Sequence, residues 1–249
     1  MDISMKYDEK FIYFLVHKDK YDPDKDILYI PIDTTPKSGS TYCNNYDILF
    51  ERESDFVIVL DGKENSRILV QERSEVLRAM FSHEVYNEDA FINPVDKNSS
   101  EFKKINLLLQ TAVPLLSGNW NATSEIYETG ELTYGNANPD SDNFNSLADF
   151  IVSGDYIEIR IPWQLLNFAN PSEMQIHDDY YENYGVEYLT IDEMYVGIGS
   201  DAQKEYRIPM ESFPLEGWGK HVTYHERLKE SYYILKDYWT SSEYVGINT

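Results

Sequence analysis

The stretch YIEIRI, residues 156–161, alternates strictly between isoleucine and a polar or amphipathic side chain. Successive side chains of a strand point to opposite faces, so the three isoleucines share one face, and Tyr156, Glu158 and Arg160 share the other. This pattern predicts a strand of an antiparallel sheet that is buried on one face only. The segment that follows, PWQLL at residues 162–166, predicts a short helical turn opened by its proline.

Outward from this strand, short apolar runs recur between turn-forming residues. Asp61-Gly62 joins two of them and predicts a hairpin. The run at residues 11–16 is apolar at both parities, which is typical of a strand covered on both faces. Pro31 is expected at a strand end or on an edge strand. The runs lie at residues 11–16, 27–30, 56–60, 67–70, 105–113, 126–134 and 189–198.

Helical spacing occurs twice in the chain. Residues 74–85 carry apolar side chains at helical intervals and predict a first helix. Nearer the end, large apolar side chains follow one another at steps of four, four, three and four, which predicts an amphipathic C-terminal helix. This second stripe consists of Tyr224, Leu228, Tyr232, Leu235 and Trp239.

Together these elements predict an all-β fold, a two-sheet antiparallel β-sandwich with short helical turns and a C-terminal amphipathic helix. We expect the sandwich to occupy residues 1–222. The helix and tail, residues 223–249, are expected to pack on it. The residues expected inside the sandwich are Phe56, Ile58, Leu60, Ile157, Ile159, Ile161, Val196 and Ile198.

The charge balance narrows the choice of partners. The 249 residues include 44 Asp and Glu against 21 Lys and Arg, a formal net charge of −23, which disfavours nucleic acid and anionic membrane surfaces. Cys43 is the single cysteine, so no internal disulfide forms. The N-terminal residues lack the apolar core of a signal peptide, and the longest apolar stretch is too short for membrane insertion.

Three segments, residues 7–16, 32–36 and 157–168, together resemble the DOMON-like sandwiches related to family 9 carbohydrate-binding modules. The ending at residues 224–236 is similar to modules that close large bacterial proteins. In those proteins a glycoside-hydrolase-like barrel or a glycosyltransferase region precedes the sandwich. The resemblance spans about residues 4–238, although such sandwiches usually begin with one or two more strands. It implies an accessory module beside an upstream domain, at the cell surface or outside the cell, and a haem-binding DOMON variant is a further alternative.

Aromatic residues in polar, loop-like sequence are the candidates for ligand contact. Sugar rings present C–H faces that pack on the rings of tryptophan and tyrosine. The aromatic residues in such sequence are Trp120, Trp218, Tyr42, Tyr46 and Tyr134. We therefore expect these five to bind a polysaccharide or oligosaccharide, with local packing as the alternative.

Two acidic turns are candidates for calcium, which prefers several converging oxygen ligands. One turn holds Asp22, Asp24 and Asp26, and the other holds Asp140 and Asp142. The EF-hand pattern fails at the first turn, because loop position 6 is not glycine and position 12 is not glutamate. A solvated turn is the alternative interpretation at both places.

Catalysis is not expected. The chain has no Gly-x-Ser-x-Gly motif, and Cys43 has no evident histidine partner in the sequence. His177-Asp178-Asp179 could begin a metal site, and pairs such as Asp192-Glu193 could serve glycoside hydrolysis. The favoured function is a non-catalytic glycan-binding module of a polysaccharide-processing protein. The alternatives are a structural domain that packs on an upstream catalytic domain and, with less support, a glycoside hydrolase.

Overall fold

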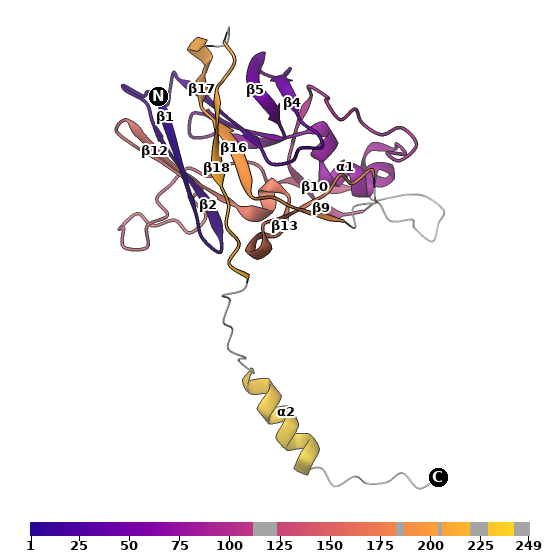
Figure 1. Cartoon of the computed structure of the whole chain (residues 1–249). Coiled ribbons are helices and arrows are strands. Elements are labelled where there is room, and N and C mark those ends of the chain that lie inside the picture. Colours follow the sequence, from indigo (N-terminus) through magenta and orange to yellow (C-terminus); the bar gives the residue numbers. More distant parts are fainter. Residues whose placement is uncertain (112–123, 183–186, 204–205, 220–228, 242–249) are drawn as a thin grey trace. The chain divides into compact units, whose positions relative to one another are not determined.

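The computed structural model describes residues 1–111, 124–182, 187–203, 206–219 and 229–241. Of these residues, 43% lie in strands and 17% in helices, so the fold is mostly β, as predicted. The chain divides into two units, Met1–Gly217 and Trp218–Thr249. The strands of the described residues all belong to the first unit (Figure 1).

A four-stranded antiparallel sheet, called sheet A here, contains the YIEIRI strand. The three isoleucines of this strand are at most 2% exposed, and so are Ile12, Phe14 and Val16 of the neighbouring strand. The predicted alternation is therefore confirmed. The order of the strands is β1 (Asp2–Tyr7), β2 (Phe11–His17), β12 (Tyr156–Pro162) and β11 (Phe150–Ser153).

A seven-stranded antiparallel sheet, sheet B, forms the other layer of the sandwich. Its two central strands are buried along residues 28–32 and 56–60, at both parities. The order along sheet B is β18 (Met210–Pro214), β16 (Glu193–Gly197), β3 (Ile27–Asp33), β6 (Phe56–Asp61), β7 (Arg67–Gln71) and β8 (Phe102–Lys104), and β17 (Gly199–Ser200) also pairs with β3.

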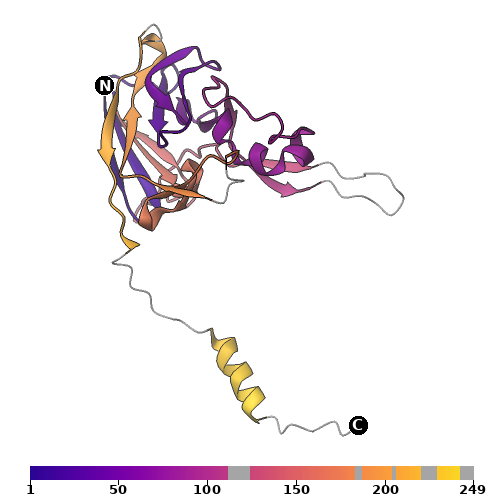
Figure 2. The same cartoon turned by 45° about the vertical axis from the view of Figure 1, so that its right-hand side comes forward.

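The central strands of sheet B are covered on both faces, because a second core of buried side chains lies on the side away from sheet A. Residues 40–54, which contribute to this core, are drawn in purple in Figure 2. The alternate residues Tyr29, Val57 and Val59 face this core. A hairpin of β4 (Ser40–Cys43) and β5 (Ile48–Ser54) supplies further members, among them Cys43 and Phe50, which are not exposed at all. The opposite parity of β3 and β6, with Ile30 and Ile58 paired, faces the sandwich core.

Pro31 lies inside β3, a central strand, and the prediction of a strand end or edge was wrong. On one side β3 pairs continuously with β6. On the other side the partner changes, because β16 pairs with Ile32 and Asp33, whereas β17 pairs with Leu28 and Tyr29. Proline has no N–H to donate, and it sits where this second ladder is interrupted.

The remaining elements are short and connect or flank the sheets. These elements are β9 (Asn106–Gln110), β10 (Glu125–Glu128), β13 (Phe168–Asn170), β14 (Gln175–His177), β15 (Tyr188–Thr190), η1 (Glu72–Ser74), α1 (Val76–Phe81), η2 (Ser82–Tyr86), η3 (Trp163–Leu166), η4 (Pro171–Glu173) and η5 (Asp201–Gln203). The predicted first helix is present as α1, which η1 and η2 flank. Trp163 of η3 is buried, and its Nε1 donates to the carbonyl of Asp8 at 2.8 Å.

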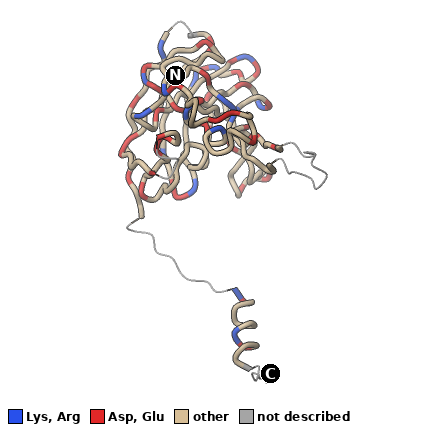
Figure 3. The backbone as a smooth tube through the Cα atoms, turned by 90° about the vertical axis from the view of Figure 1, so that its right-hand side faces the viewer, with Lys and Arg blue, Asp and Glu red and all other residues tan. Residues whose placement is uncertain are grey.

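The second unit contains α2 (Glu230–Ser241), which confirms a C-terminal helix, although residues 223–228 and 242–249 of the predicted segment lie outside the described residues. The packing of this helix on the sandwich stays a prediction. In the described part of the chain, no helix combines the length and apolarity needed to cross a bilayer. Acidic residues are spread over the first unit with lysine and arginine among them (Figure 3).

Seven of the eight residues expected inside the sandwich are buried, and Ile198 is half-buried in the gap between β16 and β17. The expectation for residues 11–16 was wrong. Tyr13 and Leu15 of β2 are 36% and 40% exposed, so sheet A is covered on one face only. This open face carries the largest hollow described below.

Candidate functional site

A groove of about 480 Å³ lies on the open face of sheet A. The register of the sheet places its side chains in rows across three strands. Lys6, Tyr13 and Arg160 form one row, and the next consists of Ser4, Leu15 and Glu158. The loop that precedes β11 supplies the wall of the groove through residues 135–138 and 148–149.

Arg160 holds this wall against the sheet. Its Nε donates to the carbonyl of Ala148 at 2.6 Å, and its Nη2 donates to the carbonyl of Ser146 at 2.7 Å. A side chain at Gly135 would come within 3.1 Å of the Ala148 Cβ, so the loop packs closely there. Because its guanidinium already binds two backbone carbonyls of the loop, the main role of Arg160 in the groove is to hold the wall in position.

Burial affects two titratable groups of the groove. It raises the pKa of Asp149, although the carboxylate also accepts the N–H of Thr133 at 2.8 Å, which opposes the rise. Burial and a 2.8 Å hydrogen bond to the Asp8 carboxylate raise the pKa of Tyr13. Tyr13 therefore stays neutral, and its side chain lines the groove while Asp8 accepts its hydroxyl.

The groove combines an apolar floor with a few polar groups. Leu15 and Tyr13 give the floor. Lys6 and Glu158 have no hydrogen-bond or ion-pair partner among the described residues, and Asn136 and Asn138 bring amides from the loop. Such a surface can bind a ligand that carries both apolar faces and hydroxyl or amide groups.

The aromatic residues singled out in the sequence lie elsewhere. Tyr42 donates its hydroxyl to Asp47 at 2.9 Å, and Tyr46 packs against the second core rather than projecting from a loop. Tyr134 directly precedes the groove wall, but its ring packs edge-on against Phe150. Trp218 is half-buried, and Trp120 lies outside the described residues.

The acidic turns are bound largely to their own chain. Asp22 pairs with Lys25 at 2.5 Å, and Asp26 accepts both Lys18 at 2.7 Å and the N–H of Asp22. Asp24, Asp140 and Asp142 are exposed. In the described ranges, the group whose ligand atoms lie close enough together for a metal is a different one, consisting of His17, Asp19 and Asp155. Calcium binding stays a prediction.

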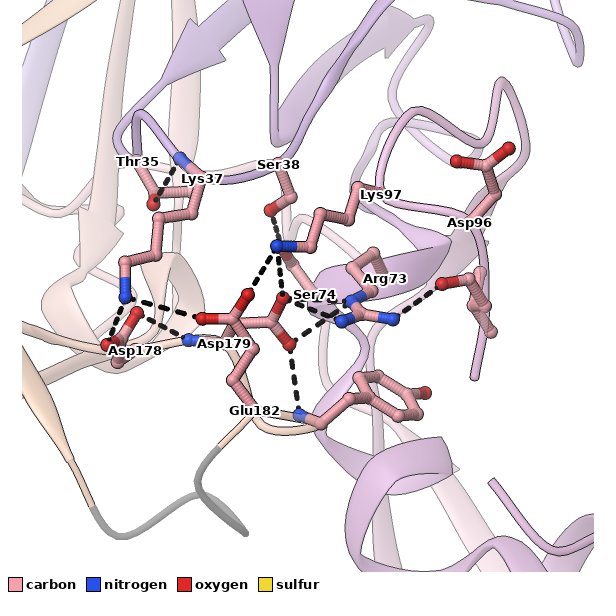
Figure 4. A network of polar contacts seen from close by, with 12 residues as sticks. Thr35, Lys37, Ser38, Arg73, Ser74, Asp96, Lys97, Asp178, Asp179 and Glu182 are labelled. Carbon is pink, nitrogen blue, oxygen red and sulfur yellow. Dashed lines mark hydrogen bonds and ion pairs between the residues drawn. The ribbon is translucent and has the colours of Figure 1, made fainter. Parts of the chain in front are cut away.

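The pair Asp178 and Asp179 belongs to a buried ion network rather than to a metal-like arrangement (Figure 4). Arg73 binds Asp179 through Nε and Nη2, the latter at 2.8 Å, and both side chains are at most 7% exposed. Lys37 binds Asp178 at 2.6 Å. Figure 4 also places Lys97 and Glu182 at this junction, where they form a further pair.

This network joins four segments that are far apart in the sequence. Arg73 also donates to the carbonyl of Val95 at 2.6 Å, and its guanidinium lies 4.3 Å from the ring centroid of Tyr181. His177, next to the network, stacks on Tyr180 with ring centroids 5.3 Å apart. Since each of these charges is matched inside the protein, we interpret the network as a structural clasp.

Cys43 offers no activated nucleophile. Its side chain is fully buried in the second core, and burial raises the pKa of the thiol to about 11. A thiolate is the reactive form, so this thiol is inert in the folded protein.

The fold and the groove define a mostly antiparallel β protein with a ligand-sized groove on an open sheet face. Comparisons with family models, with curated proteins and with solved structures find no match for this chain. The functional argument therefore rests on the geometry of the groove and on the sequence resemblance described above.

Proposed function

We propose that this protein is a non-catalytic glycan-binding or accessory module that holds a neutral or cationic polysaccharide in the sheet A groove. The observation that carries the proposal is the open sheet face, where Tyr13 and Leu15 form a floor beside the unpaired polar groups of Lys6 and Glu158. The groove volume of about 480 Å³ falls within the range of small-molecule sites. Following the resemblance, the module acts at the cell surface or outside the cell, beside an upstream domain of the same protein.

The overall charge leaves neutral and cationic polysaccharides as candidate ligands. A net charge of −23 disfavours anionic polymers, and the groove itself mixes both signs of charge. A shallow site of this kind is expected to bind at micromolar to millimolar strength, roughly −4 to −8 kcal/mol.

The test is a glycan array followed by calorimetry with the groove variant Tyr13→Ala. We expect it to weaken binding about tenfold or more, because the ring supplies the aromatic face of the floor. Tyr127→Ala, which removes an exposed tyrosine of β10 outside the groove, is the matched control and should bind like the parent protein. Release of reducing ends, measured in parallel, would establish a glycoside hydrolase instead.

A structural or interaction domain is the second candidate, and one observation favours it. The β9–β10 hairpin exposes Leu107, Leu109, Ile126 and Tyr127, each about half exposed or more. Apolar side chains on an exposed hairpin are typical of a surface that contacts another domain. This candidate would be favoured if the chain bound no glycan on the array but did bind its upstream domain.

A further inference from the structure

A second hollow, of about 220 Å³, lies at one end of the strands of sheet B, where β3 ends and β16 begins. We call it the Arg52 pocket and define it by Asp33, Arg52, Thr190, Asp192 and Tyr195. It shares no lining residue with the groove on sheet A. The two sites can therefore be tested separately.

Arg52 is fixed in one orientation. The carbon of its guanidinium lies 3.5 Å from the centroid of the Tyr195 ring, and its Nε donates to Asp33 Oδ2 at 2.7 Å. Tyr195 and Asp33 are themselves direct partners in the β16–β3 ladder, so the ring and the carboxylate are placed by the sheet. The Arg52 Nη1 and Nη2 groups make no hydrogen bond to any other described residue, and 43% of the side chain is exposed.

Acceptors lie beside these donors. Asp33 uses Oδ2 for Arg52, and its Oδ1 has no hydrogen-bond donor among the described residues. The Asp192 carboxylate, exposed at the rim of the pocket, also has no hydrogen-bond donor among the described residues. Glu193, by contrast, is occupied, because Tyr195 donates to its Oε1 at 2.7 Å and Ser212 donates to its Oε2.

The combination of donors and acceptors selects the ligand. An anion would meet Arg52 but also the carboxylates of Asp33 and Asp192, and a cation would lie against the guanidinium. Hydroxyl groups both donate and accept, so adjacent hydroxyls satisfy the free Nη groups and the free carboxylate oxygens together. We propose that the Arg52 pocket binds a neutral polyhydroxylated ligand through adjacent hydroxyl groups.

The size of the pocket limits this ligand to about one sugar ring. Its volume of about 220 Å³ lies below the range of drug-sized sites. A stacked arginine suits this role, since its planar fork is held in place before binding and little side-chain entropy is lost.

The test is an NMR titration of the whole chain with a panel of neutral methyl hexosides, observing the Arg52 side-chain Nε–H signal and, in every variant, the backbone amide signals of Thr190 and Asp192 in the pocket lining. Glucuronate and glucosamine serve as the anionic and cationic counterparts. We expect a neutral hexoside to shift this signal in the millimolar range. Arg52→Lys keeps a cation beside Asp33 but lacks the two Nη groups, and it should weaken binding about tenfold or more, the effect of a hydrogen bond to a charged group.

Two controls separate the alternatives. Tyr127→Ala removes an exposed tyrosine that lines neither hollow, and it should bind like the parent protein. Tyr13→Ala, in the sheet A groove, should leave the Arg52 signal and its titration unchanged, so failure of the groove proposal leaves this one standing. Tighter binding of glucuronate or glucosamine than of every neutral hexoside would overturn the proposal. So would an Arg52 signal that no member of the panel moves while the melting temperatures confirm folded proteins.

Discussion

Sheet A and sheet B are built from similar strands but differ in what covers them. The central strands β3 and β6 of sheet B are buried on both faces, because the β4–β5 hairpin and its neighbours form a second core on the side away from sheet A. Sheet A is buried on one face, and its other face bears Tyr13 and Leu15 in the groove. Similar apolar content in β2 and β6 thus supports stability in one sheet and a surface for binding in the other.

The largest expected effect is on the free energy of unfolding. It is seen by comparing a buried aromatic side chain of sheet B with an exposed one of sheet A. Phe56 of β6 is 1% exposed and Tyr13 of β2 is 36% exposed. Phe56→Ala should lower the free energy of unfolding by about 3–5 kcal/mol, since it leaves a cavity in the sandwich core. Tyr13→Ala should lower it by about 1 kcal/mol, the hydrogen bond to Asp8. Urea unfolding measures both, and equal losses would contradict the comparison.

A second, smaller effect concerns two aspartates with matching hydrogen bonds. Asp8, before β2, accepts two backbone N–H groups and the Tyr13 hydroxyl. Asp55, before β6, accepts the N–H groups of Thr34 and Thr35 and the Thr34 hydroxyl. Complete burial raises the pKa of Asp55 well above its usual range. For Asp8, burial is the largest single contribution and acts upward, but the hydrogen bonds together outweigh it and lower the pKa.

These opposite shifts predict opposite contributions to the pH dependence of stability. The folded protein holds the Asp55 proton more tightly than the unfolded chain, so this contribution is present below the usual aspartate range and lost as pH rises through the raised pKa. For Asp8 the contribution is lost as pH falls through the lowered pKa. Asp55→Asn should reduce the fall in stability with rising pH, by up to about 1.4 kcal/mol per pH unit. Asp8→Asn should not, and unfolding curves at several pH values would show whether the two variants differ.

The smallest expected effect concerns calcium. Asp140 and Asp142 lie between the two parts of the groove wall of sheet A, residues 135–138 and 148–149, whereas Asp22 and Asp26 are already paired with lysines. If the loop with Asp140 and Asp142 binds calcium, millimolar calcium should raise the melting temperature relative to chelator, because the ion binds the folded state preferentially. The double variant Asp140→Asn, Asp142→Asn should abolish the shift. An identical melting temperature in calcium and in chelator would exclude such a site.

The sequence predicts strands well where one physical signal dominates. In YIEIRI, alternation alone identifies both the strand and its buried face, and Ile157, Ile159 and Ile161 are buried as expected. In β2, Tyr13 and Leu15 are apolar enough to suggest a second covered face. Hydropathy indicates that a side chain can be buried, whereas its actual burial depends on which segments from elsewhere in the chain pack over it.

The groove and the clasp depend on such distant segments, which explains why the sequence did not indicate them. Arg160 faces the open side of sheet A, as its alternation predicts, but the carbonyls it binds come from a loop with no periodic pattern. Arg73 and Asp179 lie 106 positions apart. Spacing near Asp179 suggested a metal site, because a pair of adjacent acids looks the same whether a cation or an arginine neutralises it.

The burial of Cys43 gives the protein an internal reporter of its own breathing motions. A thiol reagent can reach this single cysteine only when the β4–β5 hairpin separates from sheet B, since the side chain is fully enclosed there. The rate of modification in native buffer, compared with the rate in the denatured chain, would therefore measure the free energy of that opening. Sheet A contains no cysteine, so the signal would come from the second core alone.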